Sequence, residues 1–142
     1  MVGTKQCWAI FLMTANILIL FSGISFCIIS YIRFQTENSN ERIFDLLTHV
    51  FTAIASFVGL SAMIAKNRTA LVSYGSSIIL DVVSSLARIV VLLASSEESG
   101  MAYFPILISY RCVTLVLDAA ILYSVYLLVF SESTPLNEPL DY

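Results

Sequence analysis

Four charged side chains fall inside long apolar stretches of the chain, where they could carry acid–base or ion-pair chemistry. Asp81 and Arg88 lie in one stretch, and Arg111 and Asp118 lie in the next. A charge near the centre of a bilayer costs roughly 2.5–3.5 kcal/mol on insertion scales. Neighbouring carboxylates there can share a proton, and a carboxylate and a guanidinium can pair with each other or with the charges of a partner. These four residues are the candidate site.

The spacing of the polar residues places each set on one helix face, because residues three and four apart lie on the same side of a helix. In the third apolar stretch the set is Ser77, Asp81, Ser84 and Arg88. In the fourth it is Arg111, Thr114 and Asp118. Counted from Gly100, the two aspartates are 19 and 18 residues away and the two arginines 12 and 11. We therefore expect acid beside acid at one depth and base beside base at another.

Three interpretations of these charges stay open from the residues alone. They could form a buried Asp–Arg network that fixes helix pairing. They could be a docking site that pairs with the transmembrane charges of another protein. Asp81 and Asp118 could instead form a proton or cation relay near the middle of the membrane.

The composition excludes a soluble domain. Of the 142 residues, 58% are hydrophobic and 12% are charged, whereas soluble domains have about 45–50% apolar and about 25% charged residues. The net charge of −3 and the lack of a basic patch argue against a nucleic-acid partner. The sequence predicts a single-domain integral membrane protein in contact with the lipid bilayer.

Apolar stretches of about 20 residues or more predict membrane-spanning helices, because a bilayer offers backbone groups no partner outside the span. The predicted spans cover residues 8–32, 44–65, 70–94 and 103–130. The expected fold is all-α, a four-helix transmembrane bundle over residues 1–130. Residues 131–142 are an acidic, proline-containing tail, for which we expect no fixed structure.

Small and polar residues mark the expected inner faces of the first two spans, since they let helices approach closely. In the first span these are Asn16, Gly23 and Ser30, at intervals of seven. In the second they are Thr48, Thr52, Ser56 and Gly59. Together with Ser77 and Ser84 they predict the helix-packing surface of the bundle.

The basic residues predict the orientation, because cytosolic loops carry an excess of lysine and arginine. Lys5, Lys66 and Arg68 lie on one side of the membrane, and Arg33 and Arg42 lie on the other. Both termini are therefore predicted to be cytosolic. The chain itself is expected in the plasma membrane or an endomembrane.

Reactive residues are few and are not arranged for catalysis. Cys7 lies beside Trp8 at the predicted membrane boundary, where reversible palmitoylation is an alternative to a plain interfacial thiol. Cys27 and Cys112 fall in apolar stretches, and His49 is the only histidine. The sequence has no metal-ligand spacing, no phosphate-binding loop and no nucleophile–base set. We expect no enzyme activity, no metal and no cofactor.

The first span resembles that of the tetraspanins, with Asn16, Gly23 and an Arg33-Phe34 exit. In that family an asparagine is followed by glycines seven and fourteen residues on, and Ser30 stands where the second glycine would be. The hairpin around Gly59 and Asn67 also resembles the tetraspanin turn. The large Cys-Cys-Gly loop of tetraspanins is missing here.

Two other groups of small four-span proteins are similar. Asp81 within Ile-Leu-Asp-Val-Val, followed by Arg111, resembles the type-1 angiotensin II receptor-associated protein. The length and short loops resemble MARVEL-domain proteins. All three resemblances imply a membrane organiser or trafficking adaptor. The predicted function is therefore a non-enzymatic accessory or scaffold subunit that binds other membrane proteins, or itself, through its helices. The alternative is a small proton- or cation-coupled transporter or channel subunit that uses Asp81 and Asp118.

Overall fold

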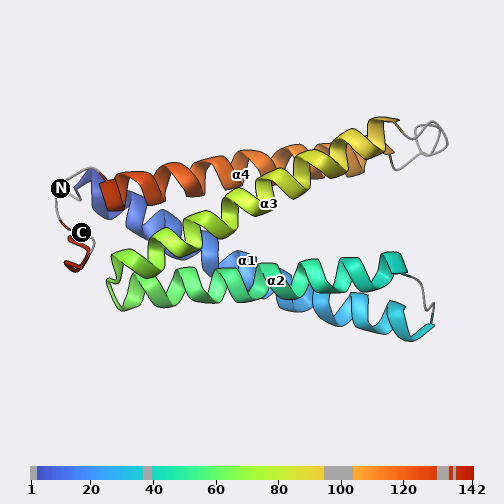
Figure 1. Ribbon diagram of the computed structural model, residues 1–142, viewed down its shortest axis with the longest axis horizontal. Coiled ribbons are helices and arrows are strands. Elements are labelled where there is room, and N and C mark those ends of the chain that lie inside the picture. Colours follow the sequence, from blue (N-terminus) through green and yellow to red (C-terminus); the bar gives the residue numbers. More distant parts are fainter. Residues whose placement is uncertain (1–2, 37–39, 95–103, 131–134, 136) are drawn as a thin grey trace.

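The computed structural model describes residues 3–36, 40–94, 104–130, 135 and 137–142. Its four α-helices are α1 (Thr4–Thr36), α2 (Asn40–Ile64), α3 (Arg68–Ala94) and α4 (Phe104–Phe130) (Figure 1). Each is long and apolar enough to cross a membrane. This fits a multi-pass membrane protein and confirms the predicted all-α four-helix bundle. Helix α1 continues about one turn beyond the predicted span at each end, because apolar composition marks the membrane-embedded part of a helix and not its last hydrogen bond.

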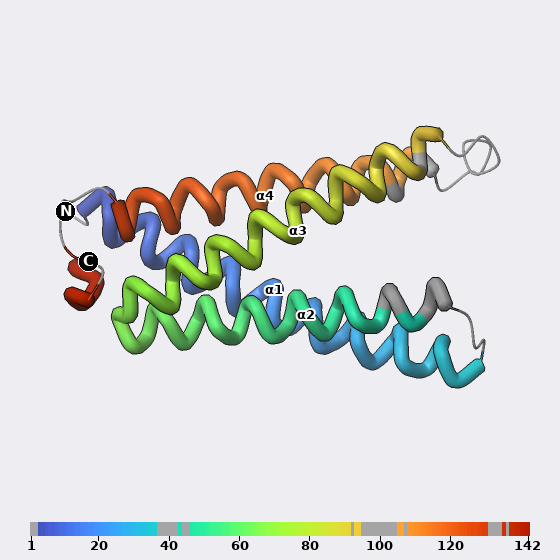
Figure 2. Tube along the Cα trace, in the orientation of Figure 1, coloured from blue at the N-terminus to red at the C-terminus, as the bar shows by residue number. Residues whose placement is uncertain are grey.

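The helices pack as a ring, with contacts between α1 and α2, α2 and α3, α3 and α4, and α1 and α4. Consecutive helices form two antiparallel hairpins, α1–α2 and α3–α4. Figures 1 and 2 show that these hairpins lie together near the chain termini and separate toward the other end. We call these the closed end and the open end.

The buried core holds the closed end together. Its fully buried side chains come from all four helices: Leu12, Met63, Leu71, Tyr74 and Ile121. Close approach of backbones adds to this packing, since a Cβ on Gly23 would lie 3.3 Å from the Cβ of Ala53 across the α1–α2 interface. Large apolar side chains remain exposed along all four helices, as expected where helices face lipid.

The tail has a defined place at the closed end, so the expectation that it has no fixed structure is wrong for its last residues. The Leu140 amide donates to the Lys66 carbonyl over 2.8 Å, and the Leu140 side chain is 2% exposed. The Tyr142 hydroxyl donates to the Met63 carbonyl at the end of α2. Partial burial raises the pKa of Tyr142, which favours the protonated hydroxyl that donates this hydrogen bond. Its ring also lies under the Lys66 ammonium, 4.9 Å from the ring centroid.

We expect Leu140→Asp to release the tail from the α2–α3 turn, because an unpaired polar group in a buried site costs about 1–3 kcal/mol. Hydrogen exchange of the residue-140 amide should accelerate about tenfold or more. The exposed neighbour Asp141 supplies the control, since Asp141→Asn should leave that protection unchanged. Unaltered exchange in Leu140→Asp would mean that the buried leucine does not hold the tail in place.

Candidate functional site

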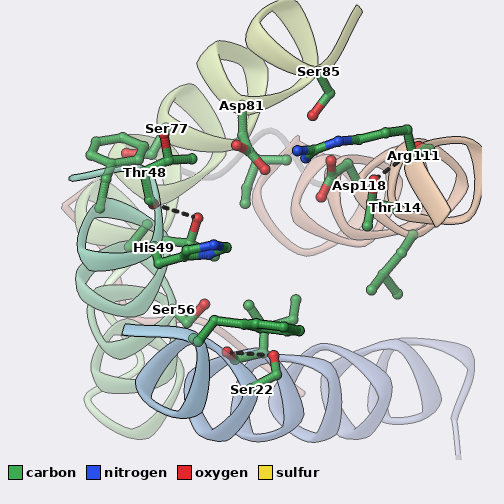
Figure 3. Close-up of a pocket in the computed structure, with 18 of the residues that line it drawn as sticks. Ser22, Thr48, His49, Ser56, Ser77, Asp81, Ser85, Arg111, Thr114 and Asp118 are labelled. Carbon is green, nitrogen blue, oxygen red and sulfur yellow. Dashed lines mark hydrogen bonds between the residues drawn. The ribbon is translucent and has the colours of Figure 1, made fainter. Parts of the chain in front are cut away.

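A cavity of about 510 Å³ lies between the two hairpins, on the side of the core that faces the open end (Figure 3). All four helices line it. Its lining includes the hydroxyl-bearing residues of α1, α2 and α3: Ser22, Thr48, Thr52, Ser56, Ser77 and Ser85. A cavity of this size, in which polar groups converge within a largely apolar surface, is typical of a binding site.

The four charged residues singled out from the sequence all line this one cavity. Asp81 and Arg88 come from α3, and Arg111 and Asp118 come from α4. Figure 3 shows Asp81, Arg111 and Asp118 gathered where α3 and α4 meet at the cavity wall. Asp118 is the most enclosed of them, with 6% of its surface exposed. The hairpin formed by α3 and α4 therefore supplies all four of these charges, and α1 and α2 supply none of them.

The charges do not neutralise one another evenly. Burial disfavours the charge on both aspartates, and the two carboxylates repel each other. Arg111 and Arg88 both attract the Asp81 carboxylate and so offset part of this effect at Asp81. Within the described part of the chain, Asp118 Oδ2 and Arg111 Nε are buried with no hydrogen-bond partner. The cavity thus holds one carboxylate oxygen and one guanidinium N–H whose hydrogen-bonding capacity is unused.

Two contacts join neighbouring helices beside the cavity. Arg88 donates to the Thr48 hydroxyl over 2.7 Å, which links α3 to α2 across the gap between the hairpins. The His49 ring stacks on Phe26, with centroids 5.2 Å apart, and links α2 to α1. His49 is therefore a packing residue of the cavity wall, as a lone histidine on an apolar helix usually is.

The exposed side chains among the cavity residues show where it opens. On α1 they include Leu18 and Phe26, and on α4 they are Tyr110 and Val113. Of the α2 residues that line the cavity, only Phe51 is exposed. The described cavity residues of α3 are all buried or half-buried. The cavity therefore opens mainly between α1 and α4. We call this gap, bordered by Leu18, Phe26, Tyr110 and Val113, the α1–α4 opening.

The predicted packing residues are distributed between the core and the cavity. The fully enclosed ones are Asn16, Gly23, Ser56 and Gly59. Ser30 is half-buried near the open end of α1, and Ser77 lines the cavity. Ser84 is half-buried and does not line the cavity, whereas its neighbour Ser85 is buried and does. The sequence analysis named Ser84 and missed Ser85, although a period of 3.6 residues allows either a three- or a four-residue step from Asp81.

The remaining reactive residues lie away from the cavity. Cys7 is exposed near the start of α1, Cys112 is exposed on α4, and Cys27 is half-buried. Palmitoylation of Cys7 stays a prediction. Among the described residues, no group of three or more His, Cys, Asp or Glu side chains is placed to hold a metal ion.

No family model matches the chain, and no curated protein or solved structure matches it. The resemblance to tetraspanins therefore rests on the sequence motifs alone. The segment that would correspond to the large loop of tetraspanins, residues 95–103, lies outside the described residues.

Proposed function

We propose that this chain is a non-enzymatic accessory subunit that binds another integral membrane protein through its transmembrane helices. One observation carries the proposal. The α1–α4 opening joins an exposed apolar rim to a buried carboxylate, Asp118, whose Oδ2 has no partner within the described chain. We further propose that both termini and the α2–α3 turn face the cytosol, because Lys5, Lys66 and Arg68 lie at the closed end.

The membrane setting explains why such an opening favours a protein partner. Lipid tails offer no hydrogen bonds to a buried polar group, so a polar group inside a membrane protein is normally satisfied by protein or water. A partner helix lying across Leu18 and Val113 would cover the apolar rim and bring polar atoms to the cavity. Packing and interhelical hydrogen bonds are the interactions that drive association of helices in lipid.

Site-specific photo-crosslinking in native membranes tests this proposal. A photoreactive residue at Val113, on the rim, is compared with one at Val83, an equally apolar and exposed position on α3 that does not line the cavity. We expect one integral membrane protein to be crosslinked in stoichiometric amount at Val113 and not at Val83. Leu18→Trp, which narrows the opening from the α1 side, should abolish this crosslink.

The other outcomes contradict the proposal in distinguishable ways. Crosslinking to lipid alone at both positions would show that no protein covers the opening. A product at twice the mass of the chain would replace the accessory role with self-association. A crosslink at Val113 that survives Leu18→Trp would place the partner elsewhere on α4.

A second candidate function, a small proton- or cation-coupled transporter, is favoured by one observation. Asp81 and Asp118 line the same cavity and act on each other electrostatically. Paired carboxylates inside a membrane are typical of ion pathways. A pH-dependent cation flux into vesicles containing the purified chain, removed by Asp118→Asn, would support transport. The accessory role predicts no such flux.

A further inference from the structure

The two aspartates of the cavity differ in their charged neighbours. Asp81 has two attractive neighbours, the guanidinium groups of Arg111 and Arg88. Asp118 and Asp81 repel each other, and for Asp118 this repulsion adds to the effect of burial. Two positive and two negative side chains therefore face the cavity, but the attraction is concentrated on one carboxylate. Asp118 is therefore the carboxylate whose negative charge the arginines do not compensate.

The local geometry keeps Asp118 uncompensated. The polar residue one helical turn before it is Thr114, whose hydroxyl donates to the backbone carbonyl of Arg111 over 2.8 Å and so does not serve the carboxylate. One turn after Asp118 stands the apolar Leu122. The carboxylate is more than nine-tenths buried, lines the cavity, and has an Oδ2 atom with no hydrogen-bond partner in the described chain.

The position of Asp118 along α4 fixes the depth at which a partner must meet it. Asp118 lies 14 residues after Phe104 and 12 before Phe130, close to the middle of the helix. At 1.5 Å per residue, it is about 20 Å from either end. A side chain carried at the middle of a transmembrane helix lies at this depth.

We propose that the partner carries a lysine or arginine in the middle of a transmembrane segment, and that this side chain enters through the α1–α4 opening and binds Asp118. The inference rests on the proposed accessory function and names the chemistry of the partner. A long basic side chain suits the site because its apolar stem would pack against the rim residues Leu18 and Val113 while its charged end reaches the carboxylate. The opposite charges would then compensate each other away from lipid.

Designed transmembrane peptides test the charge requirement without knowledge of the natural partner. Leucine–alanine peptides of about 24 residues carry lysine, glutamate or leucine at the central position and are otherwise identical. Each is labelled and titrated against the full chain in lipid vesicles, with energy transfer as the readout. We expect the lysine peptide to bind about tenfold more tightly than the leucine peptide, and the glutamate peptide to bind no better than leucine.

Variants at one position decide whether Asp118 is the receptor. Asp118→Asn keeps the shape of the side chain and should bring the lysine peptide down to the affinity of the leucine peptide. Asp118→Lys should reverse the preference, so that the glutamate peptide binds best. Asp141→Asn, which removes an exposed tail carboxylate, should change none of these affinities.

The outcomes separate this inference from the proposed function. If lysine and leucine peptides bind equally, and both are excluded by Val113→Trp, a partner helix docks at the opening but needs no basic residue. If no peptide binds and crosslinking at Val113 yields lipid alone, the inference and the accessory function both fail. If a single-chain alkylammonium binds and no peptide does, the inference is also overturned, because the site would then recognise an amphiphile.

Discussion

Replacing Gly59 with valine is expected to destabilise the bundle more than any other change at its small packing residues. A Cβ on Gly59 would lie 2.9 Å from Asn16 Oδ1 and 2.9 Å from Tyr74 Cδ2. Both neighbours are fully buried, so neither can move aside without displacing others. Overpacking of this kind costs about 1–3 kcal/mol in protein cores. The measurement is the free energy of unfolding by titration with a denaturing detergent.

Gly75 supplies the matched control for this prediction. A Cβ there would meet one side-chain methyl, Val125 Cγ1, at 3.2 Å, with no backbone or aromatic atom as close. Alanine at Gly75 should therefore cost markedly less than alanine at Gly59, and valine at Gly59 should cost most. Equal losses from the two alanine variants would show that the three-helix contact around Gly59 is not a special point of close packing.

Gly59 also shows how much of the helix packing could be predicted from the sequence. Its place on a stripe with Thr52 and Ser56 predicts an inward-facing small residue, since these positions share one helix face. The stripe does not tell which side chains fill the space left by the missing Cβ. That Asn16 of α1 and Tyr74 of α3 meet there depends on which helices are neighbours and on their relative heights, and both follow from contacts distant in sequence.

The four spans and the inward direction of the charges could be predicted because they depend on composition and helical period alone. The α1–α4 opening could not. It exists because the fully buried side chains, such as Leu12, Met63 and Ile121, gather at one end of the bundle, so the hairpins separate at the other. Exposed residues of that opening, such as Val113, are indistinguishable in the sequence from lipid-facing residues such as Val83.

The tail could not be predicted for a related reason. Its acidic, proline-containing composition is typical of segments without fixed structure, and one leucine gives no periodic signal. Leu140 is nevertheless buried because the turn at Lys66 offers it a backbone carbonyl and a site at the end of the core. Lys66 itself has a positive φ of 52°, which turns the chain sharply between α2 and α3.

Asp118→Asn and Asp81→Asn are expected to change the stability of the isolated chain by clearly different amounts. Asparagine keeps the shape of either side chain and removes its charge. At Asp118 the change relieves the repulsion by Asp81 and the burial of an uncompensated carboxylate, so we expect a gain of about 1–3 kcal/mol, within the insertion cost of a mid-membrane aspartate. At Asp81 it relieves the same repulsion and the burial of a carboxylate, but it also leaves Arg111 and Arg88 without their counter-charge, so we expect a clearly smaller gain.

The difference between the two changes is the informative quantity, and it is measured by unfolding both variants in the same detergent at neutral pH. A clearly larger gain at Asp118 would mean that Asp81 is partly compensated by the arginines, whereas Asp118 is kept at the expense of stability. A residue that destabilises its own fold is expected where binding or transport requires it. Losses at both positions would mean that Asp118 is compensated within the chain, and the requirement for a basic residue on the partner would then lose its physical basis.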